Sequence, residues 1–452
     1  MNFAVNDASA PWVGSGAWMR RVFSPGDTRV TIQPPVRLKD YVVDGKLVLS
    51  LKSYLDLVLA NNTDIAIQRL SIEVPKNAIQ RAFAIFDPLL TSNFNATRSN
   101  TPATNQLQGA QVVSQLNQPL NTRFQQLLPT STTVFSQLNW SKLSTNDQFA
   151  LYNPAYTTSW QMGFTQPLWR GRGAYITKLP ITVARASRRQ QEFSVRDSVM
   201  RLLVTAEQAY WDVISARENL KVNMEALKLA EAALERTNRE IELGATSELE
   251  RFQPEQNAAT ARINVTRTEY QLRQFEDALR RQIGADIDPD VRNLPIVLTE
   301  DVTRPPDPER YDRDKLVQVA MENRPDLKAQ RVALDINDLQ IQNAINSIKP
   351  VLNLTGSYQT FGRGGPGFSR STGVPVFIPG GPIDAWSMMF GFDYNTYQFG
   401  LQLQLPLRDR SASANLADAV VNKKLAALRE RSLEQQVRQE VLNAITNVES
   451  SR

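Results

Sequence analysis

Apolar and polar residues recur with two different periods along this chain of 452 residues. From about Lys178 to Leu243 there is no glycine and only one proline, and one apolar stripe repeats every seven positions: Val199, Ala206, Val213, Leu220, Leu227, Leu234 and Ile241. A seven-residue period is typical of left-handed coiled-coil packing. We therefore predict one very long helix, roughly 105 Å if it begins at Gly173, that needs partner helices.

The long helix is predicted to end in a tight turn formed by Leu243, Gly244, Ala245, Thr246 and Ser247. Glycine suits the left-handed residue after a helix end, and Ser247 with Glu250 forms a capping box for the next helix. That helix, 248–283, has apolar residues at alternating steps of three and four, so we expect a helical hairpin. Pro254 predicts a kink in it, to which we assign no role.

Other segments alternate with period two, as β-strands do. One face of residues 394–405 carries Tyr397, Phe399, Leu401 and Leu403, and an earlier strand carries Trp160, Met162 and Phe164; Gln, Gly and Thr alternate with them. Strands are predicted at about 89–98, 156–167, 351–361 and 394–406. Apolar faces opposed to polar ones fit lipid on one side and water on the other. A soluble sheet on a protein core gives the same alternation.

The chain also repeats itself, since residues 61–90 match residues 323–352 without a gap. The identical pairs include Asn61 with Asn323, Asp64 with Asp326, and Pro88 with Pro350. Each copy runs from helical sequence through the proline into strand sequence. A spacing of this length is too long for a solenoid and indicates a duplicated half-molecule of helix, strands and helix.

The duplication defines the expected domains. An irregular segment, 1–48, precedes a first repeat, 49–285, with helices 50–87 and 172–284. A connector, 286–310, leads to a second repeat, 311–452, with helices 312–349 and 409–452. Long polar loops are expected at 99–157 and 362–393, and residues 120–128 with 132–140 form a candidate extra hairpin in the first loop. The N-terminus lacks the apolar core of a secretory signal, and the last helix stops before a second tip turn, so we expect a fragment of a longer precursor.

Composition narrows the chemistry. The chain contains no Cys and no His, which disfavours thiol nucleophiles, Ser-His-Asp triads and the usual zinc sites. The 51 basic against 46 acidic side chains are spread along the chain, so nothing indicates a nucleic-acid partner. The glycine-rich run 362–367 has no helix after it to receive phosphate. We predict no enzyme activity, no cofactor and no metal site.

Several ordered motifs resemble the TolC family of outer-membrane efflux channels. Asn323-Arg324-Pro325-Asp326-Leu327 resembles the family's Asn-Pro-Asp-Leu signature. Thr165-Gln166-Pro167-Leu168-Trp169 resembles its Gln-Pro-Leu-Phe segment, and the turn 242–247 resembles its tip turn. Together the motifs cover about residues 49–452.

The resemblance implies a mainly α fold with membrane β-structure. A homotrimer would share a twelve-stranded outer-membrane β-barrel, with four strands from each protomer, above a periplasmic α-barrel of coiled-coil helices. It would be the passive exit duct of a tripartite efflux or type I secretion system. The partners implied are an inner-membrane transporter, a periplasmic adaptor at the tip turn 243–247, and outer-membrane lipid against the apolar strand residues named above. Drugs, metal ions and proteins all remain possible cargo.

Two other functions account for part of the pattern. A soluble coiled-coil scaffold would use its strands as a small capping domain, and fractionation separates it from a membrane channel. An adaptor subunit would have one helical hairpin and a lipoyl-like domain. The duplication counts against the adaptor.

Overall fold

The computed structural model describes residues 36, 38–104, 108–300, 312–369 and 376–451. They form two compact units, Met1–Ile72 with Ser194–Asp312 and Glu73–Phe193 with Arg313–Arg452, within those described ranges. Residues 1–35 of the predicted irregular segment 1–48, and residues 301–310 of the predicted connector 286–310, lie outside the described residues.

The first unit contains the helical hairpin and a small sheet. Its elements are η1 (Leu38–Tyr41), β1 (Val42–Val43), β2 (Lys46–Leu49), α2 (Leu51–Asn61), α3 (Thr63–Leu70), η4 (Glu248–Arg251), α7 (Phe252–Gln282) and β8 (Ile296–Leu298). Helix α6 (Leu179–Glu242) contributes residues to both units and, with 64 residues, extends about 96 Å. Strand β2 pairs antiparallel with β1 and parallel with β8. The segments predicted as irregular, 1–48 and 286–310, therefore contain short strands, which the sequence reading missed.

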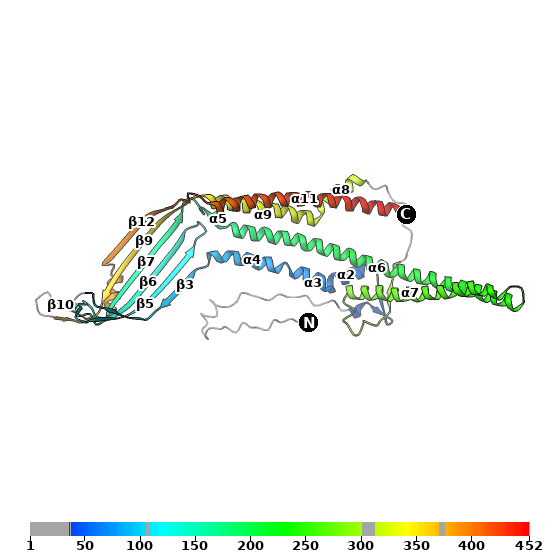
Figure 1. Ribbon diagram of the computed structural model, residues 1–452, viewed down its shortest axis with the longest axis horizontal. Coiled ribbons are helices and arrows are strands. Elements are labelled where there is room, and N and C mark those ends of the chain that lie inside the picture. Colours follow the sequence, from blue (N-terminus) through cyan, green and yellow to red (C-terminus); the bar gives the residue numbers. More distant parts are fainter. Residues whose placement is uncertain (1–35, 37, 105–107, 301–311, 370–375, 452) are drawn as a thin grey trace. The chain divides into compact units, whose positions relative to one another are not determined.

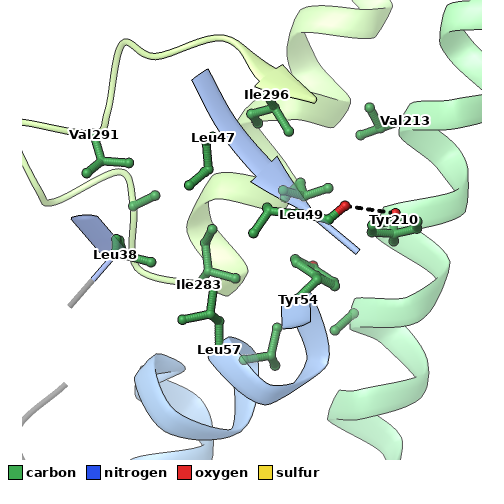
Figure 2. Close-up of a cluster of buried hydrophobic side chains, with 14 of the residues drawn as sticks. Leu38, Leu47, Leu49, Tyr54, Leu57, Tyr210, Val213, Ile283, Val291 and Ile296 are labelled. Atoms are coloured by element: carbon green, nitrogen blue, oxygen red, sulfur yellow. Dashed lines mark hydrogen bonds between the residues drawn. The ribbon is translucent and has the colours of Figure 1, made fainter. Parts of the chain in front are cut away.

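A buried cluster joins α2, α6, α7 and the small sheet (Figure 2). Tyr54 and Tyr210 are fully buried, with their ring centroids 5.5 Å apart. The Tyr210 hydroxyl donates to the Leu49 carbonyl at 3.1 Å, whereas the Tyr54 hydroxyl has no hydrogen-bond partner among the described residues. Burial raises the pKa of both phenols, because the charged form loses its hydration.

The hairpin confirms the heptad prediction. Every member of the seven-residue stripe from Val199 to Ile241 is buried or half-buried, as is the three-and-four row of α7 from Ala258 to Leu279. The kink predicted at Pro254 assumed that this proline lies inside the helix, and that position is wrong. Pro254 lies in the first turn of α7, directly after the 3₁₀ turn η4, where a missing N–H costs little.

The second unit is built on one antiparallel sheet. Its strands are β3 (Leu89–Phe94), β4 (Thr97–Pro102), β5 (Val112–Leu127), β6 (Thr133–Thr145), β7 (Ala155–Pro167), β9 (Val351–Gly364) and β12 (Tyr394–Gln404). They lie in the order β12-β9-β7-β6-β5-β3, and β4 also pairs with β5. Because β3 and β4 follow each other along the same edge of β5, the sheet has six rows. Most described residues of the predicted polar loop 99–157 form strands, so the prediction of a loop there is wrong.

The helices of the second unit lie at one end of this sheet in Figure 1. They are α4 (Glu73–Phe83), η2 (Ala84–Phe86), α5 (Ala174–Thr177), α8 (Arg313–Asn323), α9 (Pro325–Ile348) and α11 (Arg410–Ser450). Pro88 and Pro350 each come directly before a strand, β3 and β9. At the other end lie β10 (Gly367–Ser369), β11 (Val376–Ile378) and α10 (Pro382–Phe390). The predicted loop 362–393 thus contains a hairpin and a helix that the sequence reading missed.

The helix predicted over 50–87 is broken twice. Asn62 separates α2 from α3, and Ser71 with Ile72 separates α3 from α4. Pro75 explains the second break, since it has no N–H to bond to the carbonyl four residues earlier. In the second copy, 312–349, only Arg324 interrupts the helix. The last predicted helix, 409–452, corresponds to α11.

Candidate functional site

The sheet of the second unit has one apolar and one polar face. Directly paired residues point to the same side of a sheet, so the pairing register assigns every side chain to a face. The apolar face carries Leu90, Phe94, Leu120, Phe124, Val134, Leu138, Trp140, Trp160, Met162, Phe164, Leu352, Leu354, Tyr358, Tyr397, Phe399, Leu401 and Leu403. All seven predicted lipid-facing residues lie on this one face. Whether lipid covers them stays a prediction.

The opposite face is mainly polar in all six rows, although Phe135, Leu143 and Phe361 also lie on it. One line of paired residues crosses the whole sheet: Thr91, Arg123, Gln137, Gln161, Gln359 and Thr396. Arg123 donates to the Gln137 amide oxygen at 3.2 Å, and Gln137 donates to Asn139 at 2.8 Å. At the end away from the helices this face borders a cavity of about 850 Å³ whose lining includes Asn121, Asn139 and Arg363. Such a surface suits water rather than lipid.

Helix α10 covers part of the apolar face. The Thr158 hydroxyl donates to the Ala385 carbonyl at 2.8 Å, and Ala385 and Met389 are buried against the sheet. A Cβ on Gly362 would lie 1.8 Å from that same carbonyl oxygen, so the close approach depends on glycine. Ile383 and Phe390 of the same helix are exposed.

The predicted tip turn is formed as expected. Gly244 has φ +72, and the N–H of Ala245 bonds to the Glu240 carbonyl at 2.9 Å, which satisfies a carbonyl at the helix end. Ser247 caps η4 by accepting from the N–H of Leu249, but the reciprocal contact from Glu250 is absent from the described contacts, so the capping box is half formed. Leu243, Leu249 and Phe252 leave an apolar surface exposed at the turn. The prediction named Leu243 but not Leu249 or Phe252.

The repeat signature marks helix junctions. Asn61 and Asn323 end α2 and α8, and Asp64 and Asp326 lie in the first turns of α3 and α9. Pro325 is the first residue of α9, a position where its fixed φ suits a helix start. These residues therefore shape the backbone, and no signature residue lines the two-faced sheet.

Arg324, in the second junction, binds two acids. It pairs with Asp326 at 2.7 Å and with Glu440 of α11 at 2.5 Å. Burial lowers its pKa, but the hydrogen bonds and charges of Asp326 and Glu440 outweigh burial and raise the pKa above the usual value. The guanidinium therefore stays charged and holds α9 against α11.

No group of three or more Asp, Glu, His or Cys in the described ranges could hold a metal ion. The helices that the structure describes include none that is both long and apolar enough to cross a membrane.

Comparisons with known proteins agree with this architecture. Residues 316–452, less than a third of the chain, match the family model of the outer membrane efflux protein. The structure of CusC, described in connection with transmembrane channel formation, matches with a TM-score of 0.55 and 16% identity, over 91% of this chain and 77% of that chain. The predicted family resemblance is confirmed.

Two further solved structures have the same fold as this chain. The CmeC outer membrane channel of Campylobacter jejuni matches with a TM-score of 0.54 and 14% identity, over 93% of this chain and 79% of that chain. The outer membrane protein VceC of Vibrio cholerae matches with 0.56 and 12%, over 88% and 79%. The predicted outer-membrane location agrees with the family model and with both proteins. No curated protein matches the chain significantly.

Proposed function

We propose that this protein is a passive outer-membrane duct for efflux, assembled as a homotrimer. The observation that carries the proposal is the two-faced sheet, with apolar side chains on one side of every row and polar side chains on the other. In a closed barrel the apolar face meets lipid and the polar face lines water. The predicted lipid-facing residues Trp160, Met162 and Phe164, with Tyr397, Phe399, Leu401 and Leu403, take that role.

The helical parts supply the periplasmic tunnel in this proposal. The packed stripes of α6 and α7 account for one side of each helix, and exposed apolar residues remain elsewhere on them, among them Val204, Val222, Leu229 and Ile263. Such residues favour further helix contacts between copies. The exposed turn 243–247, with its apolar neighbours Leu249 and Phe252, would bind a periplasmic adaptor. The adaptor would join the duct to an inner-membrane transporter of an efflux or type I secretion system.

The proposal is tested by producing the full-length protein in a Gram-negative host, separating the membranes, and adding the purified protein to planar lipid bilayers. We expect an outer-membrane trimer that dissociates on heating and conducts ions through discrete channels. A detergent-independent species in the soluble fraction, without conductance, would instead identify a coiled-coil scaffold.

The adaptor contact is tested separately at the turn. Leu243→Asp with Leu249→Asp should abolish binding of a cognate adaptor while channels in bilayers keep their conductance. A matched control pair on exposed polar positions of the same hairpin is Glu231→Gln with Arg262→Gln, which removes a surface ion pair and should leave adaptor binding intact. Unchanged binding by the aspartate variant would contradict docking at the turn.

A further inference from the structure

We propose that the hairpin β5–β6 is part of the channel wall and that the shared barrel therefore has eighteen strands rather than twelve. The inference rests on the proposed function and concerns the size of its pore. In the sheet, β5 and β6 lie between β3 and β7. The two strands of the first half thus have a complete hairpin between them, whereas β9 and β12 of the second half pair directly.

The hairpin is continuous with the sheet on both sides. Strand β5 pairs with β3 over six residue pairs, from Leu89↔Gln125 to Phe94↔Leu120. Strand β6 pairs with β7 over eleven, from Thr133↔Thr165 to Leu143↔Ala155. With 16 and 13 residues, β5 and β6 exceed the 9–11 residues that a tilted strand needs to cross a bilayer.

The hairpin also carries the same two faces as its neighbours. Leu138 pairs with Trp160 and Trp140 with Leu120 on the apolar face, while Asn139 pairs with Ser159 on the polar face. A hairpin outside the membrane would not need to extend the apolar face. Two strands, an even number, lie between β3 and β7, and every pairing is antiparallel. Strands β3 and β7 therefore run in opposite directions, as they would if they paired directly, and each can connect to the same helices.

The unpaired edges of the sheet indicate that further copies of this chain pair with it. Among the described residues, β12 pairs only with β9, and β3 and β4 pair only with β5. Unpaired backbone groups cost several kcal/mol each in lipid, so a sheet can span a membrane only as a closed barrel. The edge strands β12 and β3 carry the same apolar and polar faces, so β12 of one copy and β3 of the next continue each face. Strand β4 is polar on both sides.

Six rows from each of three copies give eighteen strands. Barrel diameter grows roughly in proportion to strand number, so the pore through the membrane would be about one and a half times as wide as that of a twelve-stranded barrel. Barrels of this size leave an open aqueous channel, whereas the interior of small barrels is filled by side chains. The polar line through Arg123, Gln137 and Gln161 would then border a wide pore.

Thiol labelling in intact cells tests the inference, because the chain has no cysteine of its own. Leu138→Cys and Asn139→Cys are neighbours on β6 that point to opposite faces, and Met162→Cys and Gln161→Cys are the matched pair on β7. A charged, membrane-impermeant maleimide should label positions 139 and 161 and fail to label 138 and 162. Cysteines at Ser92 with Thr122, whose hydroxyls lie 3.0 Å apart, and at Ser141 with Thr157, 2.6 Å apart, should each form a disulfide.

The outcomes separate this inference from the function on which it rests. Equal labelling of 138 and 139 beside normal alternation at 161 and 162 would overturn the widened wall and leave the channel intact. Equal labelling at all four positions would overturn both. Alternation at both pairs together with both disulfides would support a wall that includes the hairpin.

Discussion

The two copies of the repeat begin as the same structure and then differ in what surrounds them. Helices α2 (51–61) and α8 (313–323) have the same length and register, and each ends in an asparagine before a one-residue break. Yet Tyr54, Leu57 and Val58 of α2 are buried, whereas α8 has no buried residue within the described structure. Matching sequence thus fixes the backbone of each copy, while its neighbours decide how much each helix contributes to stability.

The same contrast holds in the sheet. The first copy connects its strands through β5 and β6 within the sheet, and the second passes α10 over the apolar face. The strands that begin after Pro88 and Pro350 are common to both copies. The connections between strands are therefore free to vary, provided that they preserve strand direction and the two faces.

The largest expected effect breaks the comparison between α2 and α8. Leu57 and Val319 occupy equivalent positions, but Leu57 is 1% exposed and Val319 is 47% exposed. Leu57→Ala should cost about 2–5 kcal/mol, and Val319→Ala less than about 0.5 kcal/mol. Hydrogen exchange of α2 and α8, followed by mass spectrometry in the parent and in each variant, measures both losses of stability. A comparable loss of protection in α8 would show that α8 is buried in the assembled protein.

The second prediction concerns the connection that is specific to the second copy. Gly362→Ala forces a methyl group against the Ala385 carbonyl and should displace α10, at a cost of about 1–3 kcal/mol. Gly381→Ala is the matched control, because a Cβ there meets nothing within 4 Å. Proteolysis at α10 and the fluorescence of Trp386 report the displacement. If both variants behave like the parent, α10 is not packed on the sheet.

A third prediction sharpens the difference between the two helix junctions. The buried Asn62 side chain accepts hydrogen bonds from the N–H groups of Asp64 and Ile65, and donates to Gln282. Arg324 makes no such cap in the second copy. Asn62→Ala should therefore cost about 1–2 kcal/mol, and Asn62→Asp should keep the cap but lose the contact with Gln282. Thermal unfolding followed by circular dichroism ranks the three proteins, and an alanine variant as stable as the parent would contradict the cap.

The smallest effect appears only at high pH. Burial raises the pKa of Tyr54 above the value of about 10 in an unfolded chain, so its contribution to stability is intact below pH 10 and is lost as the pH rises toward the folded pKa. The equivalent residue of the second copy, Leu316, does not titrate. Hydrogen exchange above pH 10 should therefore increase in α2 more than in α8. Tyr54→Phe should reduce that difference, and an equal increase in α2 of the variant would contradict the assignment.

The repeated and periodic segments were predictable from the sequence because local patterns specify them. The stripe from Val199 to Ile241 predicted the packed face of α6, and Gly244 predicted the left-handed residue of the turn. The alternation of Trp160, Met162 and Phe164 predicted the apolar face of β7. In each case neighbouring residues in the chain carry the whole signal.

The remaining features depend on distant pairing. Strands β5 and β6 were predicted only as a candidate hairpin, since Ser136 and Lys142 interrupt the apolar face of β6 and Phe135 and Leu143 interrupt its polar face. Their place between β3 and β7 appears only when the partner strands are known. The docking of α10 depends on Thr158 and Gly362, which lie more than 200 residues apart and carry no local signal.

Electron cryomicroscopy of the full-length protein in lipid nanodiscs tests the central claim most directly, because it counts the strands of the membrane wall. We predict a closed ring of eighteen strands around three copies, with β12 of each copy paired to β3–β4 of the next and the apolar face outward. A closed ring of twelve strands, with β5 and β6 outside it, would contradict the widened wall. A sheet that stays open and outside the lipid would contradict the channel itself.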